Sequence, residues 1–218
     1  MSDTPVAVIQ SAAIRHNLQR LRSAAPGCRV MAVIKANGYG HGLVAVARIL
    51  DDVDAFAVAR VAEGVRLRAA GIGRRIVVLQ GCSDLLEARE AVDNQLEIVV
   101  HDAVHFEILS ALSGKGVVTA WLKVDTGMGR LGFGPAEAVT CLKRLRAVPA
   151  VRPDIRLMTH LACADDPDNP TTPEQLRQFD EVLQGFTGDI SISNSAGILM
   201  WPQTLEPSKL LHYTGQNW

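Results

Sequence analysis

Short apolar runs alternate along the chain with longer segments in which apolar residues recur at helical spacing. The runs are rich in Val, Ile and Leu, lack strict alternation, and have the length of strands buried on both faces. Strands are predicted at Val30–Ile34, Ala55–Ala59, Ile76–Leu79, Glu97–Val100, Ala120–Val124, Arg156–Thr159 and Ile190–Ser193. Helices are predicted at Leu43–Leu50, Val61–Ala70, Ser83–Asn94, Ala103–Leu112, Pro135–Arg146 and Pro173–Leu183.

This alternation of strand and helix is typical of α/β proteins with a parallel sheet. It fits either a doubly wound sheet or a (β/α)₈ TIM-type barrel that lacks its eighth strand, because the pattern stops after seven strands. Residues 203–218 contain no recognisable eighth strand. The pattern therefore predicts one α/β domain over residues 1–202 and no domain over residues 203–218.

Composition narrows the class of protein. Of 218 residues, 48% are hydrophobic, and the formal net charge is −1, which excludes global disorder and argues against a nucleic-acid or membrane-surface partner. The four cysteines lie far apart, which indicates small buried hydrophobes rather than a disulfide framework. Residues 1–4 show no secretory signal, and no apolar stretch approaches the roughly 18 residues of a membrane span. A cytoplasmic protein is expected.

Polar residues gather where the predicted strands end, which is where parallel α/β folds place their sites. The first strand runs into Lys35 and a glycine-rich turn that contains Tyr39. Lys35 is either an exposed residue that opens an ordinary loop, or a partly desolvated lysine able to bond to a carbonyl compound.

Polar side chains also lie at or just after the ends of three later strands. The fifth strand contains Lys123, which is costly to bury without a partner, and Arg130 follows in a loop rich in glycine. The sixth strand ends at His160, and the seventh leads into Asn194 and Ser195. The latter pair could open a helix whose N–H groups bind phosphate. A structural turn, a locally bonded histidine and a plain N-cap are the competing interpretations.

Two further clusters resemble metal sites only superficially. His101 and His105 have the i, i+4 spacing of helical ligands, but the intervening residues lack the glutamate of a metalloprotease motif. Asp165, Asp166 and Asp168 lie among prolines, which is typical of a solvated loop. No metal site is predicted.

Four segments, in order, resemble signature motifs of the bacterial alanine racemases, which use pyridoxal 5'-phosphate (PLP). They are residues 32–42 (AVIKANGYGHG), 123–132 (KVDTGMGRLG), 158–165 (MTHLACAD) and 193–197 (SNSAG). The resemblance covers about residues 3–202 and implies the TIM-type barrel of that family.

The resemblance also implies roles. Lys35 would carry PLP covalently and act as one of two acid/base groups at the substrate Cα. Tyr39 would contact the phosphate, and His160 would lie beside the pyridine ring. Asn194 and Ser195 would lie in the ring and phosphate region.

Arg130 would bind near the cofactor's phenolic oxygen and the substrate carboxylate. Lys123, which is carbamylated in many family members, would fix the position of Arg130. The implied reaction is the interconversion of L-alanine and D-alanine, which supplies D-alanine to the cell wall, in a homodimer.

The chain departs from the family after the fourth motif. The family's eighth strand with an Arg-Pro-Gly segment, and its C-terminal β-domain with the tyrosine base for the opposite face, are not recognisable in residues 203–218. Tyr213 is not assigned to that role. The sequence thus predicts an alanine racemase truncated after about residue 202, with weak or no activity. The alternatives are a non-catalytic, single-domain protein of PLP homeostasis and a product that does not fold stably.

Overall fold

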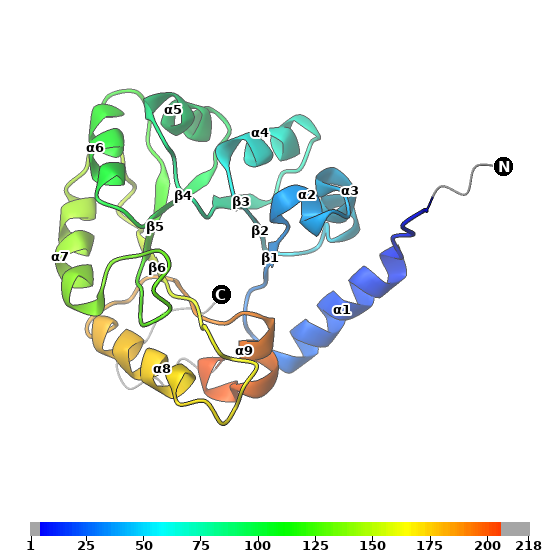
Figure 1. Cartoon of the computed structure of the whole chain (residues 1–218). Coiled ribbons are helices and arrows are strands. Elements are labelled where there is room, and N and C mark those ends of the chain that lie inside the picture. Colours follow the sequence, from blue (N-terminus) through cyan, green and yellow to red (C-terminus); the bar gives the residue numbers. More distant parts are fainter. Residues whose placement is uncertain (1–4, 206–218) are drawn as a thin grey trace.

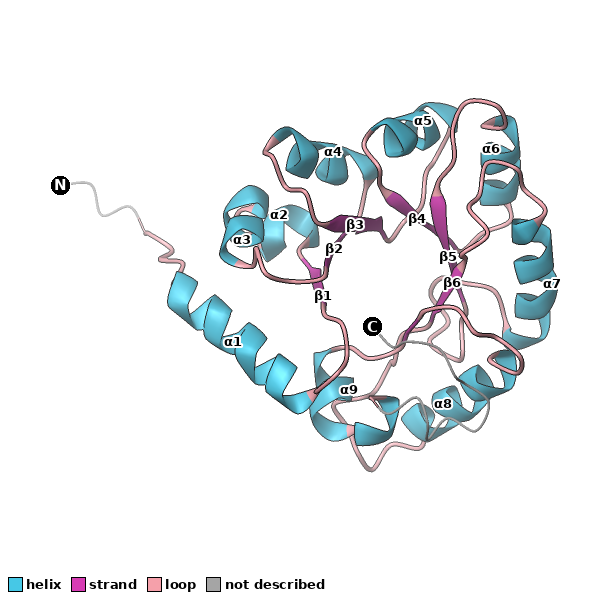
Figure 2. Ribbon diagram, turned by 180° about the vertical axis from the view of Figure 1, so that it is seen from behind, coloured by secondary structure: helices cyan, strands magenta, loops and turns pink. Residues whose placement is uncertain are grey.

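The computed structural model describes residues 5–205, and within them seven strands form one parallel sheet that curls into a ring (Figures 1 and 2). The strands follow the chain order without a reversal, which excludes the doubly wound alternative and confirms the TIM-type barrel. They are β1 (Met31–Val33), β2 (Ala55–Val58), β3 (Arg75–Val78), β4 (Glu97–Val100), β5 (Thr119–Lys123), β6 (Arg156–Met158) and β7 (Ile190–Ser191).

Helices lie outside the ring. They are α1 (Ser11–Ala24), α2 (Lys35–Tyr39), α3 (Leu43–Ile49), α4 (Val61–Ala69), α5 (Leu85–Asp93), α6 (Val104–Ala111), α7 (Pro135–Arg146), α8 (Thr171–Val182) and α9 (Ser195–Met200), followed by a 3₁₀ turn at Pro202–Thr204. The predicted bounds of α7 are confirmed, and α3 to α6 and α8 agree to within two residues. The sequence analysis did not predict α1, in which Leu18 is buried and Ile14 and Leu21 are half-buried.

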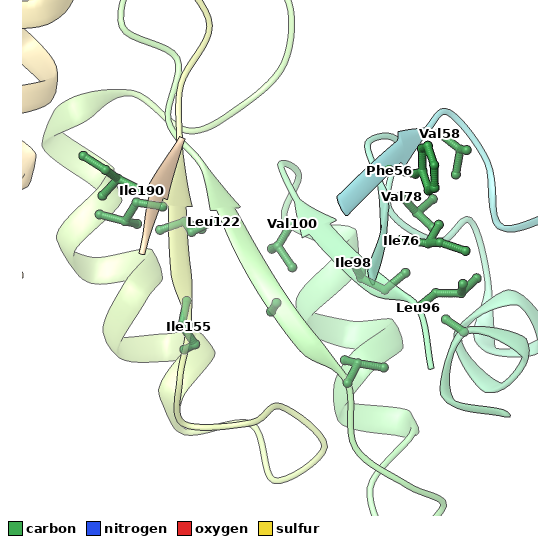
Figure 3. Close-up of a cluster of buried hydrophobic side chains, with 14 of the residues drawn as sticks. Phe56, Val58, Ile76, Val78, Leu96, Ile98, Val100, Leu122, Ile155 and Ile190 are labelled. Atoms are coloured by element: carbon green, nitrogen blue, oxygen red, sulfur yellow. The ribbon is translucent and has the colours of Figure 1, made fainter. Parts of the chain in front are cut away.

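Apolar strand residues pack on both faces of the sheet, as the runs without alternation predicted. On the outer face, Phe56, Ile76, Ile98 and Leu122 belong to the main core beneath the helices (Figure 3). A smaller cluster fills the inside of the ring, and its buried members are Ala55, Ala57, Val77, Val99, Trp121 and Met158. The interior is therefore a packed core and not a pore.

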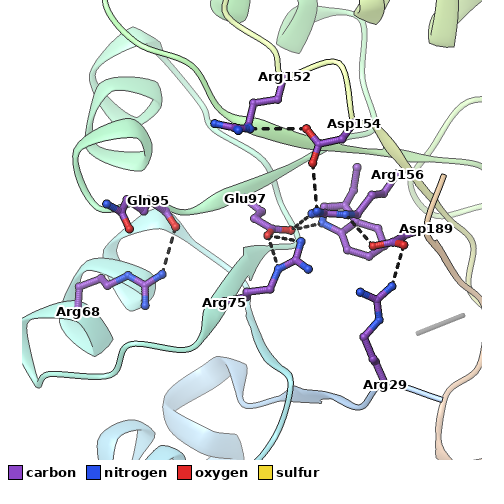
Figure 4. A network of polar contacts seen from close by, with 10 residues as sticks. Arg29, Arg68, Arg75, Gln95, Glu97, Arg152, Asp154, Arg156 and Asp189 are labelled. Carbon is purple, nitrogen blue, oxygen red and sulfur yellow. Dashed lines mark hydrogen bonds and ion pairs between the residues drawn. The ribbon is translucent and has the colours of Figure 1, made fainter. Parts of the chain in front are cut away.

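Charged residues close the end of the ring at which the strands begin (Figure 4). Glu97, the first residue of β4, pairs with Arg75 and Arg156 at 2.7 Å each and accepts a hydrogen bond from Trp121 Nε1 at 2.7 Å. Arg156 also contacts Asp189 at 3.1 Å. Because these groups are mostly buried and satisfy one another, they form a solid floor under the ring.

Strands β1 and β7 are the two ends of the sheet, and no strand within residues 5–205 joins them. Side chains connect them at the floor instead. Arg29, just before β1, pairs with Asp189, just before β7, at 2.7 Å (Figure 4). The Cys28 thiol also donates to the carbonyl of Leu205 at 3.3 Å. The chain thus holds its ring together across the gap without backbone pairing.

The four cysteines are free thiols, and their burial differs from the prediction. Cys82 is fully buried, and burial raises the pKa of its thiol to about 12, as expected of an inert core residue. The remaining three, Cys28, Cys141 and Cys163, are only half-buried. In the part of the chain that the structure describes, no helix is both long and apolar enough for a membrane crossing.

Candidate active site

A cavity of about 920 Å³ lies at the end of the ring where the strands finish. The seven residues predicted from the sequence all line it, and they are Lys35, Tyr39, Lys123, Arg130, His160, Asn194 and Ser195. Their segments follow β1, β5, β6 and β7, and the carboxyl ends of parallel strands share one rim. This topology brings together residues that lie as much as 160 positions apart in the sequence.

Lys35 is half-buried and opens α2, which is not an ordinary helix. Ala36, Asn37, Gly38 and Tyr39 have positive φ angles of 53°, 56°, 64° and 53°, so the segment forms one left-handed turn. Such a conformation costs non-glycine residues roughly 1–2 kcal/mol each. Backbone strain of this kind is concentrated at functional sites.

Local bonds hold this turn in place. The N–H of Gly38 donates to Ile34 O at 2.8 Å, and the N–H of Gly42 donates to Asn37 O at 2.8 Å. The Asn37 side chain accepts from the N–H of Leu43 at 3.1 Å, at the start of α3. The turn therefore fixes the backbone beside Lys35. The sequence signal was the Asn-Gly pair, which tolerates positive φ.

Lys123 is the last residue of β5, and its Nζ donates to Val124 O at 3.0 Å. Burial lowers the pKa of Lys123 to about 8; Asp125 opposes the shift and Arg130 adds to it. A fraction of the amine is consequently neutral at physiological pH, and a neutral amine is a nucleophile.

The loop after β5 presents Arg130 to the cavity. Asp125 Oδ1 accepts hydrogen bonds from the N–H groups of Gly127, Met128 and Gly129, at 2.9 to 3.1 Å. At its base the loop closes by backbone bonds, from Phe133 N to Lys123 O at 3.0 Å and from Asp125 N to Phe133 O at 2.9 Å. Arg130 itself is exposed, and it lies on a loop whose backbone is held by the hydrogen bonds just described.

His160 follows β6 and is half-buried. Burial lowers the pKa of His160 to about 4, and three nearby cations add to the shift, namely Arg130, Lys123 and Lys35. Because each cation opposes protonation, the imidazole is neutral at physiological pH. The cavity therefore places the neutral imidazole of His160 beside Lys35, Arg130 and a partly neutral Lys123.

Sequence reasoning missed a buried polar bridge behind His160. Gln175, on α8, donates to His160 O at 3.0 Å and accepts from the N–H of Ala162 at 2.9 Å. Thr126 and Thr159 share a hydrogen bond of 2.8 Å next to it. The available signal was an amide side chain on the buried face of α8, where Leu176 and Phe179 lie in the helical pattern.

Asn194 and Ser195 begin α9. Asn194 is the N-cap: its Oδ1 accepts from Gly197 N at 2.9 Å, and its Nδ2 donates to Leu161 O at 3.1 Å. The N-cap interpretation therefore holds for Asn194 and not for Ser195, which is exposed at the first helical position beside the cavity.

The remaining polar clusters do not contact the cavity. His105 is buried in α6, with its ring edge-on to that of His101 at 4.6 Å. Asp165, Asp166 and Asp168 are exposed. Among residues 5–205 no group of three or more His, Cys, Asp or Glu side chains is arranged to hold a metal ion.

One wall of the cavity is apolar and was not anticipated. Leu18 and Leu21 of α1 line it, together with Val33 at the edge of β1 and Ile198 of α9. The cavity thus extends from the polar rim into the gap between the two ends of the sheet.

Comparison with known proteins places these features in a family. Residues 9–210 match the family model described as alanine racemase, N-terminal domain. Over 204 residues the chain is 46% identical to the alanine racemase of Shewanella piezotolerans and 44% identical to that of Shewanella sediminis. Each match covers 94% of this chain but 57% of the relative, so the chain spans a little over half the length of these proteins.

Solved structures agree. The crystal structure of the biosynthetic alanine racemase from Pseudomonas aeruginosa superposes with a TM-score of 0.83 at 37% identity, covering 94% of this chain and 56% of that one. The alanine racemase from Acinetobacter baumannii superposes with a TM-score of 0.81 at 28% identity, covering 96% of this chain and 60% of that one.

Proposed function

The chain belongs to the family of alanine racemase N-terminal domains, and on this premise we propose that it forms the part of an alanine racemase that binds PLP. One observation carries the proposal: seven residues from four strand ends line a single cavity. We assign residues 1–202 to this domain and leave residues 203–218 outside it. Residues 206–218, Tyr213 included, lie outside the described part of the chain.

The chemistry of the donor set fits PLP. Covalent attachment of the PLP aldehyde requires a primary amine on the protein, and Lys35 supplies one. A phosphate group and a phenolic oxygen are anionic or partly so, and both suit a cavity lined by Arg130 and the hydroxyls of Tyr39 and Ser195. A volume of about 920 Å³ lies within the range of small-molecule and cofactor sites.

Lys35 would hold the cofactor through its ε-amino group. When bound, PLP supplies an electron sink that makes the Cα proton of an amino acid removable at neutral pH. The Lys35 amine would take or return the Cα proton on one face of the substrate. The left-handed turn beside Lys35 would keep that amine in a fixed position.

Arg130 would bind the substrate carboxylate and lie near the phenolic oxygen of the cofactor, as a guanidinium suits paired oxygen acceptors. Lys123 is a candidate for carbamylation, because its lowered pKa of about 8 leaves part of the amine free to react with carbon dioxide. The resulting carbamate would be an anion that orients Arg130.

His160 would lie against the pyridine ring as a neutral aromatic group. Tyr39 would contact the phosphate. Asn194 shapes the start of α9, and Ser195 would offer its hydroxyl to the ring and phosphate region. Ser195 and Tyr39 are both exposed in the protein alone, so their polar groups are free to meet a ligand.

We further propose the interconversion of L-alanine and D-alanine as the reaction of the assembled enzyme, a homodimer that supplies D-alanine for the cell wall. Racemisation requires a proton donor on each face of the substrate. Tyr39, the one tyrosine within residues 5–205, is assigned to the phosphate. The family resemblance implies a tyrosine of the C-terminal β-domain as the donor for the second face, so this donor would come from outside these residues.

Borohydride trapping tests the cofactor assignment. The purified chain is incubated with PLP, its absorbance near the visible edge is recorded, and the adduct is reduced and located by peptide mass mapping. We expect the label on Lys35, loss of the absorbance in Lys35→Ala, and no change in Lys143→Ala, which removes an exposed lysine of α7. A label on another side chain, or on none, overturns the proposal.

Exchange of the alanine Cα proton in deuterated water tests the reaction. We expect the PLP-loaded chain to exchange one enantiomer, through Lys35, much faster than the other. Retained PLP binding without exchange of either enantiomer would instead favour the alternative function, a non-catalytic protein of PLP homeostasis.

A further inference from the structure

Gln175 is a fully buried amide on the face of α8 that packs against the barrel. An apolar residue of similar length would pack there without losing hydration, so core packing alone does not require an amide at this position. The hydrogen bonds of Gln175, and the segments that they connect, therefore offer a reason for an amide at this position.

The amide reaches both loops that deliver charged or aromatic groups to the cavity. Its Nε2 donates to His160 O at 3.0 Å, and its Oε1 accepts from Ala162 N at 2.9 Å, so it grips the backbone on both sides of Leu161. Nε2 also approaches Thr126 Oγ1 at 3.4 Å, in the loop that leads to Arg130.

The same two loops touch at a second buried point. Thr126 Oγ1 and Thr159 Oγ1 share a hydrogen bond of 2.8 Å, and both side chains are almost fully buried. Gly127 lies against Gln175, since a Cβ at this glycine would come within 3.7 Å of Gln175 Cγ. The β5 and β6 loops are thus fastened to each other and to α8.

We propose that Gln175 is a positioning residue, which sets His160 and the loop of Arg130 at a fixed distance from each other in the cavity. An amide suits this task because one side chain both donates and accepts. Where PLP is concerned the inference rests on the proposed function, but the placement of His160 can be measured without any cofactor.

Two variants break the bridge from opposite sides. Gln175→Met keeps the length of the side chain and removes its hydrogen bonds, and Thr126→Val keeps the shape of the threonine and removes its hydroxyl. Two variants on α8 serve as controls. Thr172→Val removes a buried hydroxyl without a hydrogen-bond partner in the described structure, and Val182→Ala opens a small cavity away from both loops.

The first measurement is the imidazole titration of His160 by NMR in the protein without PLP. Loosened loops admit water to the ring, so in Gln175→Met its pKa should rise from about 4 by about one unit or more toward the ordinary value. Thr126→Val should shift it in the same direction by less. Both controls should leave it unchanged.

The second measurement is the dissociation constant for PLP. Gln175→Met should bind about tenfold more weakly, since misplaced supporting groups loosen a site. Val182→Ala should bind PLP as tightly as the wild type does, even if its melting temperature falls as far as that of Gln175→Met.

The outcomes separate two failures. If the titration of His160 in Gln175→Met matches that in Val182→Ala at equal loss of stability, Gln175 is a structural residue and the inference is wrong. If wild type and Lys35→Ala fail alike to bind PLP, the proposed function falls, while the titration still decides the role of Gln175. Should Gln175→Met not fold, the titration of Thr126→Val decides, and an unshifted pKa overturns the inference.

Discussion

His160 illustrates how much the surroundings of a single residue change its chemistry. A histidine with an ordinary pKa would be partly charged near neutral pH. Here burial and three neighbouring cations keep the ring neutral until about pH 4. A neutral ring can lie beside the pyridine of PLP without adding another positive charge to the cavity.

Removing the charge of Arg130 should raise the pKa of His160, because Arg130 is the foremost of the cations that oppose protonation. We expect the imidazole of Arg130→Gln to titrate measurably closer to its ordinary value of 6.5 in an NMR experiment. Arg48→Gln, which removes an exposed arginine of α3, should leave the titration unchanged. An unshifted pKa in Arg130→Gln would show that Arg130 does not contribute to the low pKa of His160.

The same shift predicts a pH dependence of stability. Because the folded state disfavours the proton on His160, the unfolded state binds more protons between about pH 6.5 and 4. The free energy of unfolding should therefore fall as the pH is lowered through this window. Urea titrations of wild type and His160→Gln should converge at low pH; parallel curves would contradict the assignment.

At the scale of elements, short loops rather than helices carry the strain and the polar chemistry. The left-handed turn of α2 demonstrates this, since the five consecutive residues 36–40 adopt positive φ next to Lys35. Gly38 is the position in the turn with least room, because a Cβ there would approach Val46 Cγ2 to 3.2 Å.

Substitutions in this turn should have unequal effects. Gly38→Ala adds a Cβ at positive φ against Val46 and should lower the free energy of unfolding by about 1–2 kcal/mol. Ala36→Gly relieves a residue already at positive φ, and the greater freedom of the unfolded chain, about 0.4–1 kcal/mol, offsets the gain. Urea denaturation compares the two; an equal loss in both would argue against a strained turn.

The loop after β5 depends on one carboxylate. Burial acts to raise the pKa of Asp125, but the N–H groups of residues 127–129 outweigh it and hold the pKa below its ordinary value. Asp125→Ala should release these amides to faster hydrogen exchange, whereas Asp125→Asn keeps the accepting oxygen and most of the protection. In the wild type, protection should persist at neutral pH and fall only as the carboxylate is protonated in acid.

How far the sequence predicts this molecule depends on the kind of signal. The strands and α7 were found because apolar runs and the helical spacing of apolar residues are local signals. The helix α1 was missed although it packs against both α3 and α9, because contacts with other elements leave no local signal in its own residues. The predicted site residues lie at or after strand ends in the structure, and their roles stay predictions. Gln175 was not found, because its hydrogen-bond partners lie more than ten residues away along the chain.

At the scale of the whole molecule, the ring is closed by side chains. Arg29 and Asp189 are about a quarter exposed, so their ion pair is shielded from solvent more than a surface pair is. It joins the segment before β1 to the floor network beneath β7.

A double-mutant cycle measures this connection. We expect Arg29→Met and Asp189→Asn to show a coupling energy of about 1–3 kcal/mol. The exposed pair Arg177–Glu181 on α8 should give about 0.5 kcal/mol or less. A coupling as small as that of the surface pair would mean that the ring does not depend on Arg29.

The gap between β1 and β7 gives a bound molecule a mechanical part to play. Lys35 stands just beyond one end of the sheet and Ser195 just beyond the other. A ligand bound by both residues would bridge the gap between β1 and β7 at the rim, as Arg29 bridges it at the opposite end of the ring. Its binding free energy would then add to the free energy of unfolding. The melting temperature of the protein should therefore rise with ligand concentration.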